Sequence, residues 1–147
     1  MTFIPDGSGQ VFFPAKQDIG RETRSIGWLG DHVPKRGTVG PAALAAMKYF
    51  RTAHRRGDPF RGVHLCEICK KEIGREEFFV DLEGVRYILP QMVVHYIEDH
   101  GYAPPNEFQE RLERFWIAEG RRLTQANPSA ACVLAPSEAN LVSADRA

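Results

Sequence analysis

Residues 62–69, GVHLCEIC, place two cysteines three positions apart, and residues 95–100, HYIEDH, place two histidines five positions apart. A C-x2-C turn presents two thiolates on one tight loop, and two histidines near the end of a helix can supply the opposite edge of a tetrahedron. Zinc favours such mixed sulfur and nitrogen ligands. We therefore predict a structural Zn2+ site formed by Cys66, Cys69, His95 and His100.

The two histidines do not lie on one face of an ideal helix. Five residues correspond to about 140° around the helix axis at 3.6 residues per turn. Their rings can meet only if the last turn before Gly101 loosens. His64 stays ambiguous at this point, because it can replace a helix histidine, donate a hydrogen bond to a ligand, or cap the loop.

Two alternatives need no metal. The C-x2-C pair could be a redox pair, but no apolar parallel strand leads into it, as a thioredoxin-like context requires. The cysteines could also be buried free thiols, with the histidines as capping or core residues. The agreement of ligand type, spacing and element order favours zinc over both.

The sequence predicts a protein without enzymatic activity. Four protein ligands leave no position for a catalytic water. Neither an H-E-x-x-H helix nor the H-x-E…P-C-x-x-C deaminase signature is present. Some nucleases are built on a similar knuckle, the loop that carries the C-x2-C cysteines (here residues 62–69), and place a histidine or asparagine on the hairpin that follows. Residues 76–90 contain neither residue type. The sequence also contains no Gly-rich phosphate-binding loop, so no small-molecule substrate is evident.

The predicted fold class is α+β. A helix begins at Pro41 and ends before Gly57, with His54 as a cation favoured by the helix dipole. A hairpin spans 77–82 and 85–89, and a second helix runs from Pro90 to Gly101. Knuckle, hairpin and helix in this order are typical of a treble-clef or enlarged C2H2 finger. A third helix has Asn106 as N-cap and ends near residue 123; its inward side chains are predicted to be Phe108, Leu112, Phe115 and either Trp116 or Ile117.

We predict one domain over residues 1–124 and a flexible tail over 125–147. Its N-terminal lobe, 1–60, is read as strand-rich, with strands at 10–13 and 25–29 and Trp28 as a core anchor. The zinc lobe spans 61–124. The tail has no hydrophobic period, and its Cys132 is read as a free thiol.

The charges are balanced overall but unevenly distributed. The chain has 19 basic and 19 acidic residues, and eight basic residues fall between 48 and 75. A dipolar surface favours a protein partner, so the leading hypothesis is a non-enzymatic adaptor or immunity-type protein. The alternative is nucleic-acid binding by the basic stretch 48–75. Its phosphate contacts would come from Lys48, Arg51, Arg55, Arg56, Lys70 and Lys71.

The expected cellular compartment follows from the membrane and secretory signals that the sequence lacks. No run approaches the roughly 18 apolar residues that cross a bilayer, and the N-terminus has no secretory pattern. Three cysteines are an odd number for a disulfide framework. We expect a cytoplasmic protein that does not contact a membrane.

Two motifs resemble a group of small bacterial zinc-binding proteins of uncharacterised activity. These share the G-x-H-x-C-x2-C knuckle, found here at 62–69, and the block H-Y-x3-H-x-Y-x-P-P-x-E-F, found here at 95–108. The Gly27-Trp28-Leu29 stretch is similar as well, so the likeness extends over about residues 25–115. It implies a bacterial cytosolic protein with ligands at Cys66, Cys69, His95 and His100, and it brings no established activity.

Overall fold

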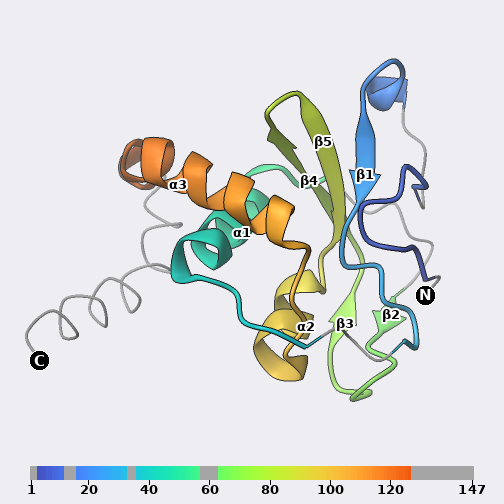
Figure 1. The fold of residues 1–147 in the computed structure, drawn as a ribbon. Coiled ribbons are helices and arrows are strands. Elements are labelled where there is room, and N and C mark those ends of the chain that lie inside the picture. Colours follow the sequence, from blue (N-terminus) through green and yellow to red (C-terminus); the bar gives the residue numbers. More distant parts are fainter. Residues whose placement is uncertain (1–2, 12–15, 33–35, 57–62, 127–147) are drawn as a thin grey trace, which may run out of the picture.

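The computed structural model describes residues 3–11, 16–32, 36–56 and 63–126. Over these ranges the fold is mixed α/β, with three α-helices, a three-stranded sheet and a two-stranded sheet (Figure 1). In the larger sheet, β4 (Glu77–Leu82) and β5 (Val85–Pro90) form an antiparallel hairpin, as predicted. β1 (Thr23–Ser25) pairs in parallel with β5, which gives the order β1-β5-β4. This sheet therefore joins the predicted N-terminal lobe, 1–60, to the predicted zinc lobe, 61–124.

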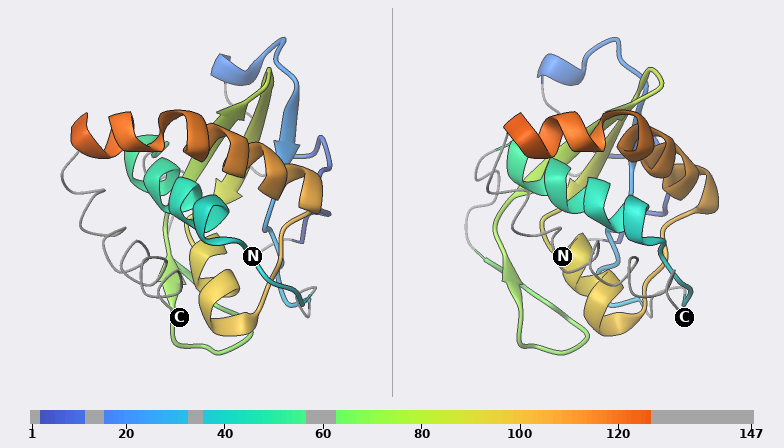
Figure 2. Two further views of the ribbon diagram at one scale, coloured as in Figure 1. Left: turned by 60° about the vertical axis from the view of Figure 1, so that its left-hand side comes forward. Right: turned by 90° about the vertical axis from the view of Figure 1, so that its left-hand side faces the viewer.

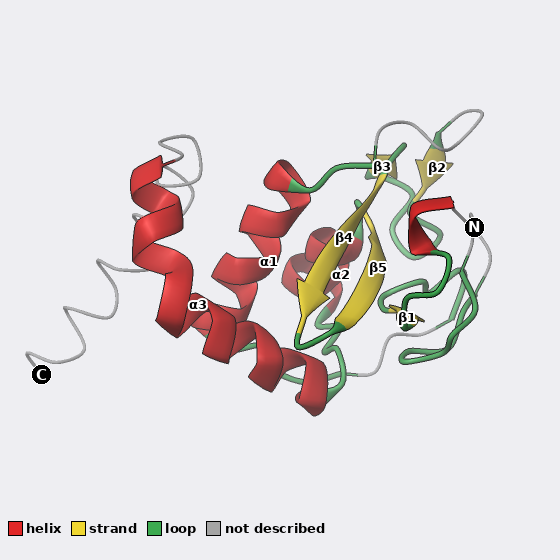
Figure 3. Ribbon diagram, turned by 90° about the horizontal axis from the view of Figure 1, so that it is seen from above, coloured by secondary structure: helices red, strands yellow, loops and turns green. Residues whose placement is uncertain are grey.

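Two helices cover one face of the larger sheet. α1 (Pro41–Ala53) begins with proline in its first turn, where the missing N–H costs no hydrogen bond. α3 (Asn106–Ala126) packs beside α1, as the views from the side and from above show (Figures 2 and 3). α2 (Val93–His100) is shorter and follows directly from the end of β5. None of the described helices is long and apolar enough to cross a membrane.

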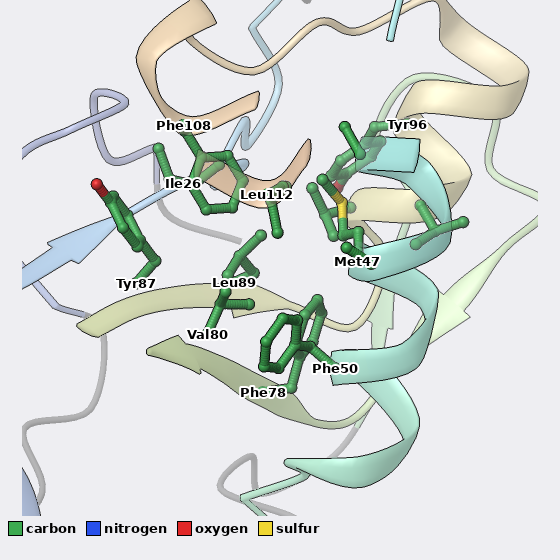
Figure 4. Packing of buried hydrophobic residues seen from close by; sticks show 14 of the residues in the cluster. Ile26, Met47, Phe50, Phe78, Val80, Tyr87, Leu89, Tyr96, Phe108 and Leu112 are labelled. Atoms are coloured by element: carbon green, nitrogen blue, oxygen red, sulfur yellow. The ribbon is translucent and has the colours of Figure 1, made fainter. Parts of the chain in front are cut away.

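The core lies between the sheet and these helices. From the sheet, Phe78, Val80 and Leu89 point toward Met47 and Phe50 of α1 (Figure 4). Phe108 and Leu112 of α3 close the same cluster and are 1% and 0% exposed, as their helical spacing predicted. The sulfur-bearing side chain of Cys66 belongs to this core as well, so the knuckle is joined to the main fold.

The opposite face of the sheet is covered by irregular chain. Trp28 is fully buried beside Ile4 and Ile88, and its indole N–H donates to the Ile88 carbonyl at 3.0 Å. The predicted strand at 25–29 is wrong in extent, because β1 ends at Ser25 and Gly27 takes a left-handed φ of +80°. The predicted strand at 10–13 is absent at Gln10 and Val11, and its other residues lie outside the described ones.

Residues that follow α1 protect the open edge of β4. The Arg56 N–H donates to the Glu77 carbonyl at 3.0 Å, and the Phe79 N–H donates to the His54 carbonyl at 3.2 Å. His54 is consequently packed against Phe79, and burial lowers the pKa of its ring. Burial favours the neutral imidazole, which opposes the expected role of His54 as a cation at the helix end.

The knuckle forms the smaller sheet. β2 (His64–Leu65) pairs antiparallel with β3 (Ile73–Gly74), with Leu65 opposite Ile73 and His64 opposite Gly74. Gly74 is buried against Met92, and a Cβ at this glycine would lie 2.7 Å from the Met92 Cγ. The absence of a side chain at Gly74 therefore lets this two-stranded ribbon, β2 and β3, approach the start of α2.

Three predicted boundaries need correction. Pro90 ends β5 rather than beginning α2, because it pairs with Glu77 and the helix starts at Val93. Asn106 is the first residue of α3 rather than its cap, and the Pro105 carbonyl accepts from the Gln109 N–H. Of the two residues considered for an inward position on α3, Trp116 packs against the core beside Phe115, whereas Ile117 is 81% exposed. α3 continues to Ala126; the rest of the predicted tail, with Cys132, lies outside the described residues.

The short 3-10 helix η1 (Lys16–Asp18) completes the fold. It brings Asp18 over the face of the larger sheet that α1 and α3 do not cover. There Asp18 joins Arg56 at 2.9 Å and Arg86 at 3.1 Å. Arg56 also reaches Glu77 at 3.2 Å, so a buried ion network links η1, the end of α1 and both strands of the hairpin.

Candidate metal centre

The four predicted ligands converge. One ligand atom from each of Cys66, Cys69, His95 and His100 lies within 4.8 Å of every other. The Cys66 sulfur is 3.5 Å from Nε2 of His100, and the Cys69 sulfur is 3.4 Å from Nε2 of His95. The two Nε2 atoms are 3.2 Å apart. A group of two sulfurs and two imidazole nitrogens at these distances can hold a metal ion.

Backbone hydrogen bonds shape the thiolate turn. The Cys66 N–H donates to the Glu72 carbonyl at 2.7 Å, and the Lys70 N–H donates to the Cys66 carbonyl at 2.9 Å. Lys70 takes a left-handed φ of +59°, which closes the loop after the second cysteine. The N–H of Lys71 is the main cause that lowers the pKa of the Cys69 thiol to about 6, with smaller contributions from hydrogen bonds to His100, Glu72 and Cys66. The turn therefore favours the thiolate, the form that binds metals.

A widened last turn of α2 brings the two imidazoles together. The N–H of Gly101 donates to the Tyr96 carbonyl, five residues earlier rather than four, and the N–H of Tyr102 donates to the same oxygen. Gly101 has a φ of +66°, the left-handed conformation that ends many helices. The loosening predicted from the five-residue spacing is thus present, and it is located at the residue expected.

One residue of the site was not assigned from the sequence. The Asp99 carboxylate is 2.8 Å from Nδ1 of His95, the ring nitrogen that does not face the sulfurs. Carboxylates in this position fix the tautomer and orientation of metal-binding histidines. The available signal was the spacing, since a carboxylate four residues after a histidine on a helix lies on the same face.

The site is partly enclosed by the fold. Cys66 is buried, whereas Cys69, His95 and His100 are partly exposed. Tyr96 packs beside both histidines with ring centroids 5.9 Å and 6.3 Å away, and burial raises the pKa of its hydroxyl. His64 does not belong to the four-residue group, although it lies on the adjacent strand β2 and burial lowers the pKa of its ring.

The residues predicted to contact nucleic acid do not form one free basic surface. Lys48 pairs with Glu98 at 3.0 Å, and Arg55 pairs with Glu76. The Arg56 side chain is only 5% exposed within the network of Asp18 and Glu77, so its prediction as a surface contact is wrong. Arg51, Lys70 and Lys71 have no ion-pair partner in the described part of the chain.

Two hollows on the described part of the surface lie away from the four-residue group. One of about 300 Å³ lies between the end of α1 and the start of β4 and is bordered by Arg51, Arg55 and Glu76 among others. A smaller one, of about 110 Å³, lies beside Tyr87 and Arg111. None of the four convergent cysteines and histidines lines either hollow.

The chain belongs to the DUF7919 family, a domain of unknown function, which it matches over residues 3–113. The match covers the whole four-residue group and the larger sheet. No curated protein and no solved structure matches the chain. Neither a metal nor an activity is part of the family's description, so the chemistry of the site rests on its own geometry.

Proposed function

We propose that Cys66, Cys69, His95 and His100 hold a structural zinc ion. The observation that carries this proposal is the set of distances between the ligand atoms. Zinc bonds of about 2.3 Å to sulfur and about 2.0 Å to nitrogen, at tetrahedral angles, place sulfur and nitrogen about 3.5 Å apart and two nitrogens about 3.3 Å apart. The separations of 3.5, 3.4 and 3.2 Å fit these edges.

The donor set supports zinc over other ions and a structural role over a catalytic one. Two thiolates and two imidazoles are the ligands of structural zinc, whereas magnesium and calcium prefer oxygen. The two sulfurs and two nitrogens would take all four tetrahedral positions around zinc, which would leave none for a water that could attack a substrate. The order of ribbon, hairpin and helix supports the treble-clef or enlarged-finger assignment.

The size of the knuckle explains why it needs a metal. β2 and β3 have two residues each, and a two-stranded ribbon of this length is not stable alone. An ion bonded to Cys66 and Cys69 on the ribbon and to both histidines of α2 would fix the ribbon to the main core. Binding energy at such sites is folding energy.

The proposed function is a non-enzymatic module that binds another protein, of the adaptor or immunity type. Zinc then holds a recognition surface rigid and takes no part in chemistry. The thiolate ligands support a reducing compartment such as the cytoplasm, and the motif resemblance supports a bacterial origin. The ion pairs of Lys48 and Arg55 and the burial of Arg56 favour a protein partner over nucleic acid.

The test compares two cysteine variants. Cys66→Ser removes a proposed ligand, whereas Cys132→Ser changes the remaining cysteine, which is not among the four proposed ligands, and serves as the control. We expect one zinc per chain by elemental analysis in the wild type and in Cys132→Ser. Cys66→Ser should lose both the metal and thermal stability. Replacement of the metal by cobalt should give the intense visible absorption of a tetrahedral S2N2 site; absence of metal from the purified wild type would refute the proposal.

A further inference from the structure

Exposed aliphatic side chains are concentrated on the knuckle. Val63, Leu65, Ile68 and Ile73 are 48%, 44%, 38% and 49% exposed. The other large hydrophobic residues exposed in the described ranges are scattered, namely Phe3, Ile19 and Ile117. Four such side chains within eleven residues, on the element that the metal would hold, need an explanation that the zinc site alone does not give.

Strand geometry places three of these side chains, Val63, Leu65 and Ile73, together, with Ile68 at the end of the ribbon. Leu65 and Ile73 are directly opposite in the antiparallel ribbon, so their side chains lie on the same face. Val63 precedes Leu65 by two positions, which in extended chain places it on that face as well. The other face carries Gly74, which is packed against Met92. Ile68 lies at the end of the ribbon, in the turn between the two cysteines.

We propose that this knuckle face, Val63, Leu65, Ile68 and Ile73, binds a short apolar segment of a partner protein that carries acidic residues. The inference rests on the proposed protein-binding function and names its surface and its partner's chemistry. The ribbon cannot turn this face inward, because its opposite face is in contact with α2 and its turn holds two of the metal ligands. A face held in water by covalent and metal constraints is available to a partner.

The extent of the face favours a short segment over a second folded copy. The exposed aliphatic surface is on the order of 300 Å², similar to the largest patch on a typical monomer, and such patches are often functional. A stable interface between folded proteins uses about 800 Å² on each side. A peptide-like segment with two or three apolar side chains fits the smaller area. β2 and β3 lie away from α1 and α3 (Figures 1 and 3).

Charge determines the rest of the partner's chemistry. Lys70 and Lys71 precede β3 and Arg75 follows it, so cations stand at both ends of this strand. All three residues are exposed, and no ion pair is formed by them within the described ranges. Of the carboxylates in this stretch, Glu67 takes part in another interaction, and the exposed Glu72 offsets one cation, so the face keeps a basic excess. Acidic side chains beside the apolar anchors of the partner would complement this arrangement.

The test uses a displayed library of random twelve-residue peptides, selected on the full, metal-loaded chain. The expected peptides combine aliphatic or aromatic residues with Asp or Glu. Leu65→Thr with Ile73→Thr removes the apolar contact while it keeps strand-forming residues opposite each other. We expect at least tenfold weaker binding of the selected peptides to this double variant.

Two further variants make the result specific. Ile19→Thr with Ile117→Thr changes two exposed isoleucines elsewhere and should leave binding unchanged. Lys71→Glu with Arg75→Glu should weaken binding of the acidic peptides at least fivefold and select basic peptides instead. Zinc content and melting temperature, measured on every variant, show that the fold is retained.

The outcomes separate this inference from the proposed function. Peptides that bind the double threonine variant as well as the wild type would overturn the knuckle face and leave a protein-binding function in place. A folded, metal-loaded chain that selects no peptide would count against both. Recovery of random single-stranded oligonucleotides, released by the knuckle substitutions, would also overturn the inference in favour of a nucleic-acid partner.

Discussion

The carboxylate of Asp99 lies 2.8 Å from Nδ1 of His95, while Nε2 of the same ring lies 3.4 Å from the sulfur of Cys69. The ring is therefore held from one side and presented to the thiolates from the other. Asp99 and His95 are four residues apart on α2, so the helix itself sets this geometry. A carboxylate on one ring nitrogen of a histidine, with the other ring nitrogen free to bind a metal, is the arrangement by which proteins orient a metal-binding imidazole.

Asp99→Asn should weaken metal binding about 10- to 100-fold, because the amide no longer fixes the tautomer of His95 or raises the basicity of its ring. The measurement is competition with a chromophoric chelator at neutral pH. Glu98→Gln, which changes the neighbouring carboxylate that pairs with Lys48, is the matched control and should retain wild-type affinity. Equal affinities for the two variants would show that Asp99 does not support His95.

Glu77 should make the protein less stable as the pH rises. Its carboxyl is 1% exposed, and burial raises its pKa from 4.5 to about 7 against the opposing effect of Arg56. Between these values the folded chain keeps a proton that the unfolded chain releases. The stabilising contribution is complete below pH 4.5 and is lost as the pH passes 7; at about 1.4 kcal/mol per pKa unit the loss approaches about 3 kcal/mol.

The check is urea unfolding of the wild type and of Glu77→Gln between pH 5.5 and 8. The variant should gain stability over the wild type at the upper end of this range. Comparison of the two proteins at each pH cancels the effect of protonation on metal affinity. Glu76→Gln, which alters the adjacent carboxylate paired with Arg55, is the control. A constant difference between Glu77→Gln and wild type across the range would contradict the prediction.

Gly27→Ala should destabilise the fold by about 3 kcal/mol. A left-handed φ costs an L-residue about 1–2 kcal/mol, and overpacking adds a similar amount. The residue has a φ of +80°, and an added Cβ would lie 2.6 Å from Cγ2 of Val93. Gly84→Ala is a matched control because Gly84 has a φ of +84° but open space around it. Urea midpoints should place the loss at Gly27 well above that at Gly84; equal losses would remove the steric part of the argument.

Leu112→Ala and Ile117→Ala should differ strongly although both lie on α3. Leu112 is fully buried between the sheet and α1, so its truncation leaves a cavity and should cost about 2–5 kcal/mol. Ile117 is 81% exposed, and its truncation should change stability by less than about 0.5 kcal/mol. The free energies of unfolding measured by denaturant titration decide this; a costly Ile117→Ala would mean that this side chain is covered in solution.

Much of the site could be predicted because its determinants are close in sequence. The thiolate turn is a local loop, and the two histidines belong to one short helix whose end is marked by Gly101. The hairpin was predictable for the same reason, since Glu83 and Gly84 at its turn have positive φ angles of 51° and 84°. Asp99 was missed as a site residue because a carboxylate between two histidines has many roles, and only the three-dimensional arrangement selects one.

Other features depended on contacts between distant segments. The sequence pattern treated Arg56 as a surface cation, yet the pairing of residues 54–56 with the edge of β4 carries it into a buried network. The strand predicted at 25–29 was shifted because β1 pairs with β5, about 60 residues away, and Gly27 then turns the chain over Val93. Pro90 was read as a helix start, but the register with Glu77 keeps it in β5.

The amino-acid sequence by itself determined the ligand types, their spacing and the helices and hairpin that carry them, because these follow from residue chemistry and short-range backbone preferences. Only the tertiary structure decided that the two sulfurs and two ring nitrogens lie within 4.8 Å of one another, that Arg56 is buried and that the aliphatic side chains of the knuckle are exposed. These properties depend on which surfaces pack against each other. Packing is a sum over residues far apart in the chain, and no local pattern records it.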